Sequence, residues 1–225
     1  MDIIFSLPLP YVICNKIFIY ACKSPHDDLG IGVLNHFTNT DDFSKFPDKD
    51  NSLSIFYSSH YAFLNQIKPL DIFKLGNFTN LTDISITDFS PDLSITDSLS
   101  FRHQSPVIGD IEIFRFMPHL TSIYITYSNI YGDISALKNL SNLNTLCLLS
   151  TNITGNINHL STLKFLNFIV IKDTNVSGNI CDICLLPFLH RASFVRTNVI
   201  LKDKNELNHI RSSNHFPYCF FILLI

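Results

Sequence analysis

Apolar residues recur with a period of 23 residues over the C-terminal half of this chain. Four of the seven glycines mark the period, at residues 109, 132, 155 and 178. If each glycine is counted as position 1, positions 3, 6, 9, 12, 15, 17 and 22 are apolar in every unit, position 12 is always leucine and position 21 is always asparagine. A fixed period of this length indicates a solenoid, so each unit is expected to form one coil of a stack.

The spacing within a unit predicts two kinds of segment. Positions 3, 6, 9 and 12 have a period of three, which drifts off the face of an α-helix, whereas positions 15 and 17 have the period of two of a short strand. Asparagine is a turn residue that tolerates left-handed backbone, and the glycine that follows permits a tight bend, so a turn is expected at position 21. Strands of successive units would then stack in parallel, about 4.8 Å apart.

This unit resembles the leucine-rich repeat, in the motif L-x-x-L-x-L-x-x-T-N-I-x-G-x-I over residues 143–157. The Gly-x-Ile after the turn is similar to the plant-type extracellular variant, which usually runs 24 residues and carries proline after the isoleucine. The resemblance implies an α/β fold, a right-handed leucine-rich-repeat solenoid with a short parallel β-sheet on its concave face. The family normally has asparagine at position 20. Serine or threonine stands there in this chain and can bond fewer backbone groups, which implies a weaker ladder between coils.

The chain divides into four segments on this basis. Residues 1–22 are apolar and form either a signal or a cap, and residues 23–69 are an N-terminal flank without the repeat. The solenoid is predicted over residues 70–200, with residues 93–108 as a degenerate or shortened coil that breaks the spacing. Residues 201–225 are predicted to be a C-terminal cap or a truncated tail.

Composition excludes several classes of protein. With 225 residues, 46% hydrophobic and 16% charged, the chain can bury a sizeable core and does not have the composition of a disordered protein. Its 16 basic and 19 acidic residues give a net charge of −3, so no nucleic-acid partner is predicted. Six cysteines are too few for a disulfide scaffold.

One short pattern is of the kind found in metal or redox sites. Cys181-x-x-Cys184 lies in the last unit, and His159 of the preceding unit could lie nearby. A structural zinc site needs a second pair of ligands, which the sequence lacks, so two half-buried thiols or a capping disulfide are the preferred interpretations. The sequence also has no phosphate-binding glycine loop, no His-Glu-x-x-His and no Gly-x-Ser-x-Gly. We predict no catalytic residue, no metal site and no cofactor, and therefore no enzyme.

Positions 14, 16 and 18 of each unit alternate with the apolar positions 15 and 17, so their side chains should leave the core and form three columns on the concave face. Aromatic residues and arginine, which tend to dominate binding energy, occur among them. The predicted partner contacts are Tyr124, Thr126, Thr145, Cys147, Leu149, Phe168, Val170, Lys172, Arg191 and Ser193. The competing interpretation is that the chain covers this flank itself, through residues 218–225.

The sequence therefore favours a protein-protein interaction module that uses the concave face of a solenoid to bind another protein, whose identity it does not give. The alternative is a fragment of a larger cell-surface or receptor-like protein. The resemblance implies recognition outside the cell, so a secreted or cell-surface location is favoured over a cytoplasmic one, and membrane association is left open. Five glycosylation sequons avoid the three columns, at Asn77, Asn80, Asn139, Asn152 and Asn175.

Overall fold

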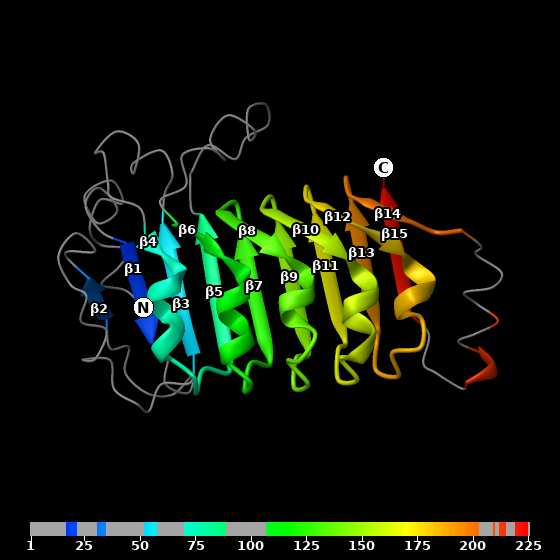
Figure 1. The fold of residues 1–225 in the computed structure, drawn as a ribbon, viewed down its shortest axis with the longest axis horizontal. Helices are drawn as coiled ribbons and strands as arrows, with labels where there is room; N and C mark the ends of the chain where they lie inside the picture. Colours follow the sequence, from blue (N-terminus) through cyan, green and yellow to red (C-terminus); the bar gives the residue numbers. More distant parts are fainter. Residues whose placement is uncertain are drawn as a thin grey trace, which may run out of the picture.

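A computed structural model describes residues 17–21, 31–34, 52–57, 70–88, 107–202, 209, 212–214 and 219–224. The coils are stacked side by side, with the N-terminal strands at one end and the C-terminal strand at the other (Figure 1). A complete coil contains a strand of a long sheet, a strand of a second sheet and a short 3-10 helix. The predicted stack of coils is confirmed.

The long sheet, called the concave sheet from here on, contains nine strands in the order β15-β13-β11-β9-β7-β5-β3-β1-β2. In chain order they are β1 (Ile17–Ala21), β2 (Ile31–Leu34), β3 (Ser52–Tyr57), β5 (Asp83–Asp88), β7 (Ser122–Thr126), β9 (Thr145–Leu149), β11 (Phe168–Lys172), β13 (Arg191–Val195) and β15 (Phe220–Leu224). Strands β3 to β15 pair in parallel, and β1 and β2 are antiparallel additions at the N-terminal end. Equivalent positions of neighbouring units are paired, so each position forms a column across the sheet.

A second parallel sheet, which the sequence did not predict, has the order β14-β12-β10-β8-β6-β4. Its strands are β4 (Leu70–Asp71), β6 (Val107–Asp110), β8 (Asn129–Asp133), β10 (Asn152–Asn156), β12 (Asn175–Asn179) and β14 (Asn198–Ile200). In β8, β10 and β12 the apolar position 22 is fully buried between polar neighbours. One buried residue per strand is too weak an alternation to predict a strand from sequence.

The prediction of a turn at position 21 is wrong, because that asparagine begins a strand of the second sheet. The described residues other than glycine that have a positive φ lie two positions earlier, at position 19, where φ is 49–54°. They are Tyr127, Ser150, Asp173 and Arg196. In this conformation the N–H of position 19 can bond to the next coil: Ser150, for example, donates to the carbonyl of Lys172 at 2.8 Å. A hydrogen bond between coils thus compensates for the strained backbone.

The period of three at positions 3 to 9 corresponds to a 3-10 helix, which has three residues per turn. The described helices are η2 (Ile72–Asn77), η4 (Ile111–Phe116), η5 (Ile134–Leu137), η6 (Ile157–Thr162) and η7 (Ile180–Ile183). The residue at position 2 caps each helix, because its side chain accepts a hydrogen bond from the backbone N–H two residues later. Aspartate and asparagine both serve as this cap, which explains why the first three units can have aspartate there and the last two asparagine.

The glycine at position 1 lies over the capping side chain of the preceding coil. Gly155 has φ +99°, and a β-carbon there would lie 2.5 Å from Oδ1 of Asp133. Glycine is therefore required both by its backbone conformation and by the space available. Gly132 likewise has a positive φ, at +113°.

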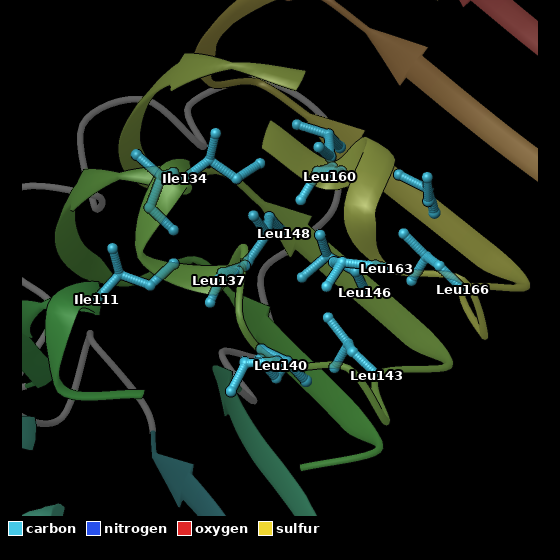
Figure 2. Packing of buried hydrophobic residues seen from close by; sticks show 14 of the residues in the cluster. Ile111, Ile134, Leu137, Leu140, Leu143, Leu146, Leu148, Leu160, Leu163 and Leu166 are labelled. Atoms are coloured by element: carbon cyan, nitrogen blue, oxygen red, sulfur yellow. The ribbon is translucent and has the colours of Figure 1, made fainter. Parts of the chain in front are cut away.

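The core runs the length of the stack between the two sheets and the 3-10 helices. Figure 2 shows side chains of neighbouring coils packed against one another in this interior. The leucines of the repeat that it labels are all fully buried: Leu137, Leu140, Leu143, Leu146, Leu148, Leu160, Leu163 and Leu166. The apolar positions deduced from the period are thus the core positions.

The prediction of a degenerate or shortened coil over residues 93–108 falls mostly outside the described residues, because the structure describes only residues 107 and 108 of this range. The described strands on either side pair directly with each other: β5 with β7, and β4 with β6. No complete coil therefore stands between these strands.

The concave sheet also extends past both limits predicted for the solenoid. Strand β3 adds a parallel strand before residue 70, and β15 adds one after residue 200. Part of the apolar segment 1–22 lies in the sheet as β1. Within the described residues, no helix is long and apolar enough to cross a membrane.

Candidate protein-binding face

Side chains of the concave sheet alternate between the core and the outer face, as the register predicts. In β11, Ile169 and Ile171 are fully buried, whereas Phe168, Val170 and Lys172 are partly exposed. The strand pairing carries this alternation to the neighbouring strands. Positions 14, 16 and 18 therefore form the outer face of the sheet.

Eight of the ten predicted contact residues are accessible on this face. Tyr124 is 39% exposed, and Arg191 is also exposed. The partly exposed residues are Thr126, Thr145, Leu149, Phe168, Val170 and Lys172. Partial burial raises the pKa of Tyr124, which stays a neutral phenol available as a hydrogen-bond donor.

Cys147 and Ser193 are corrections to the predicted set, because each is only 6% exposed. Cys147 is paired in register between Tyr124 and Val170. Ser193 is likewise paired between Val170 and Ile222. Each small side chain is flanked by two larger ones, so it faces outward and yet has little contact with solvent. Burial raises the pKa of the Cys147 thiol to about 12, which makes it unreactive at neutral pH.

Arg191 and Phe168 form a cation-π pair on this face. They are register partners on adjacent strands, and the guanidinium carbon lies 5.5 Å from the ring centroid. Such stacking holds the arginine against the sheet and covers one flat face of the guanidinium group. The N–H groups around its edge remain available for a partner.

A second aromatic pair lies in the turns that precede β11 and β13, and the sequence did not predict it. Phe165 and Phe188 are stacked with their ring centroids 6.0 Å apart, and they are 54% and 50% exposed. Both occupy position 11, three residues before Phe168 and Arg191 respectively. The side-chain amide of Asn144 donates to the carbonyl of Phe165 at 3.2 Å and ties this turn to the preceding coil. A comparison of position 11 across the units could have found the pair.

The cysteine pair belongs to the packing of the last coil. Cys184 is buried and Cys181 is partly buried, and the Cys184 thiol donates to the Cys181 carbonyl at 2.8 Å. Both are thiols, so the capping disulfide is not formed. No group of three His, Cys, Asp or Glu side chains is placed to hold a metal ion in the part of the chain that the structure describes.

The motif, the leucine core and the stacked parallel strands together define a leucine-rich-repeat solenoid. The chain is similar to several solved structures at low identity and with TM-scores below 0.5. The ectodomain of the Arabidopsis thaliana receptor kinase GASSHO1/SCHENGEN3 is 18% identical over 56% of this chain, with a TM-score of 0.44. The Arabidopsis thaliana SOBIR1 ectodomain is 19% identical over 66% of this chain (TM-score 0.42), and the Listeria monocytogenes internalin inlF 20% identical over 72% (TM-score 0.43).

This chain spans only part of each of those proteins. The matched regions cover 14% of the GASSHO1/SCHENGEN3 chain, 65% of the SOBIR1 chain and 45% of the internalin chain. No family model matches the sequence, and no curated protein matches it.

Proposed function

We propose that this chain is a protein-interaction module rather than an enzyme, and that it binds its partner on the concave sheet. The observation that carries the proposal is the group formed by Tyr124, Phe168 and Arg191 on one rigid face. Aromatic residues and arginine are the types that most often dominate binding energy at protein interfaces. Here they are accessible on a sheet whose other side is fully packed, so their positions are fixed before a partner arrives.

The position of the C-terminal strand β15 supports the proposal that the outer face of the concave sheet is accessible. Strand β15 pairs in parallel with the edge of β13 and extends the sheet by one strand. Its residues Phe220–Leu224 therefore lie beside the face rather than across it. This removes the main reason for expecting the chain to cover its own aromatic residues.

A secreted or cell-surface location forms part of the proposal. Four of the sequon asparagines are exposed, and none lies on the concave sheet; they are Asn80, Asn139, Asn152 and Asn175. Glycans at these sites would leave the binding face clear. The alternative, that the solenoid is part of a larger cell-surface or receptor-like protein, uses the same face and makes the same prediction for it.

The test is a quantitative pull-down with two triple variants, each verified as folded by circular dichroism. The test variant truncates the concave sheet, with the substitutions Tyr124→Ala, Phe168→Ala and Arg191→Ala. The control variant truncates exposed residues of the second sheet, with the substitutions Tyr131→Ala, Thr154→Ala and Ile200→Ala.

Partners recovered by the native protein should fall at least tenfold with the first variant and stay within twofold with the second. Unchanged recovery with the first variant would remove the concave sheet as the binding face. A loss with the second variant alone would assign binding to the opposite side of the solenoid.

A further inference from the structure

Charge is distributed unevenly along the concave sheet. From β5 to β15, the charged residues at positions 14, 16 and 18 are Asp83 on β5, Lys172 on β11 and Arg191 on β13. The carboxylate of Asp83 already accepts hydrogen bonds from the hydroxyls of Thr82 and Thr121, at 2.6 and 3.4 Å. Strands β7 and β9 between them contribute no charge. The face therefore has a basic end, which consists of Lys172, Arg191 and the Phe168 ring.

Neither cation of this basic end forms an ion pair with a carboxylate in the described part of the chain. The other two arginines that the structure describes are both paired: Arg115 with Glu112, and Arg196 with Asp173. Arg191 instead stacks on Phe168, and its N–H edge makes no ion pair with a residue that the structure describes. A guanidinium that lies against a ring is positioned to bind a carboxylate through two parallel hydrogen bonds.

The surroundings strengthen such a contact. Val170 and Leu149 are partly exposed beside the basic end, and the rings of Phe165 and Phe188 are exposed in the turns that precede β11 and β13. Apolar neighbours exclude water and lower the local dielectric, so a charge pair formed there is stronger than one formed in open solvent. The same side chains offer apolar contact to residues that flank the acid.

The spacing of the two cations limits the shape of the partner. Arg191 and Lys172 occupy positions 14 and 18 of adjacent strands, so they are separated by four residues along the strand and one strand across. At about 3.3 Å per residue and about 4.8 Å between strands, the separation is about 14 Å. Two acidic residues four apart in an extended segment are about 13 Å apart.

We propose that the basic end of the concave sheet binds an extended acidic segment of the partner protein. One carboxylate pairs with the guanidinium of Arg191, and a second, four residues away, pairs with the ammonium group of Lys172. An apolar side chain between them packs against Val170 and Leu149. This inference rests on the proposed function and specifies the chemistry of its ligand.

The probe is a displayed library of random 12-residue peptides whose C-termini are fused to the carrier, so only side-chain carboxylates are presented. Selection on the native protein should enrich aspartate and glutamate, with an excess of pairs four residues apart. Selected peptides are then synthesised with amidated C-termini, together with forms in which the acids are replaced by their amides. Their Kd values are measured against the native protein and its variants at two salt concentrations.

Arg191→Gln should weaken the acidic peptide at least tenfold and its amide form no more than twofold, and the acidic peptide should also weaken steeply with salt. Lys172→Gln should act in the same direction with a smaller effect. Lys164→Gln is the matched control, because it removes an exposed cation outside the concave sheet and should leave both peptides unchanged.

The two proposals fail in different ways. Peptides without acidic enrichment, whose binding is lost with Tyr124→Ala but not with Arg191→Gln, would overturn the acidic-segment inference and leave the binding face intact. Peptides whose binding neither substitution affects would overturn the concave sheet as the binding face. A library that yields no binder on the native protein counts against both.

Discussion

Gly155→Ala should destabilise the protein by about 1–3 kcal/mol, through two separate effects. The backbone of Gly155 has φ +99°, where a residue with a β-carbon is strained by roughly 1–2 kcal/mol. The new β-carbon would also lie 2.5 Å from Oδ1 and 2.7 Å from Cγ of Asp133. That carboxylate caps η5 by accepting the N–H of Ser135 at 2.7 Å, and the loss of such a cap costs about 0.5–2 kcal/mol. The lower entropy of the unfolded alanine chain offsets about 0.4–1 kcal/mol.

Urea denaturation followed by circular dichroism measures the loss, and a double-mutant cycle with Asp133→Ala separates the two effects. If the collision with the cap contributes, Gly155→Ala should cost about 1 kcal/mol less once Asp133 has been truncated. Gly76→Ala is the matched control, because Gly76 is not among the glycines with positive φ. Its β-carbon would meet only the flexible end of Ile113, at 2.9 Å, so its effect should be close to zero.

Two outcomes would contradict this reasoning. A neutral or stabilising Gly155→Ala would refute both the strained backbone and the close approach. An equal loss with and without the Asp133 carboxylate would refute the contact between the glycine and the cap, and would leave the backbone conformation as the whole cause.

Three further predictions test the register, the buried hydroxyls and the caps. Ile171→Asp should destabilise the protein by several kcal/mol in thermal melts because it buries an unpaired charge, whereas Val170→Asp should destabilise it little. Equal destabilisation by the two substitutions would show that the assigned strand register is wrong by one residue. Thr151→Val should be neutral or stabilising by up to about 1 kcal/mol in urea melts, because the buried Thr151 hydroxyl has no hydrogen-bond partner in the described part of the chain. Thr174→Val should destabilise the protein, because the Thr174 hydroxyl accepts a hydrogen bond from the backbone N–H of Val176 at 3.4 Å. The hydrogen bond from the backbone N–H of Ser135 holds the pKa of Asp133 below its ordinary value of 3.8. The Asp133 carboxylate therefore contributes stability above pH 3.8, and this contribution is lost as the pH falls below that value. Asp133→Asn keeps the cap and should make the stability depend less on pH in this acid range.

The period of the repeat was sufficient to predict the core and the parallel sheet, because burial repeats at fixed positions in every coil. It was not sufficient to predict the turn. The left-handed residues at position 19 share no side-chain chemistry, being tyrosine, serine, aspartate and arginine in successive coils. In the first three of these coils the conformation is compensated by a backbone hydrogen bond to the next coil, which any residue except proline can form. No sequence pattern records such a bond, whereas the invariant asparagine at position 21 suggested a turn that is in fact a strand.

The sequence was sufficient to predict which side chains of the candidate site face outward, but not how much of each side chain is exposed to solvent. Alternation along a strand predicts which way Cys147 faces, but whether it meets solvent depends on the sizes of Tyr124 and Val170 on the neighbouring strands. The Phe165 and Phe188 stack likewise exists because two consecutive coils place a ring at the same position. Both features depend on contacts between coils, which appear only when the units are compared column by column.

The same comparison shows where the specificity of the face must lie. The buried positions are nearly identical from coil to coil, and so are the capping and turn glycine positions, so they can carry no information about a partner. The outward columns do differ from coil to coil, and in the described coils their charge changes from Asp83 at one end to Lys172 and Arg191 at the other. A partner that recognises this chain rather than another solenoid of the same fold has to contact those differences. That requirement, together with the open N–H edge of Arg191, is the physical reason to look for an acidic ligand at β11 and β13.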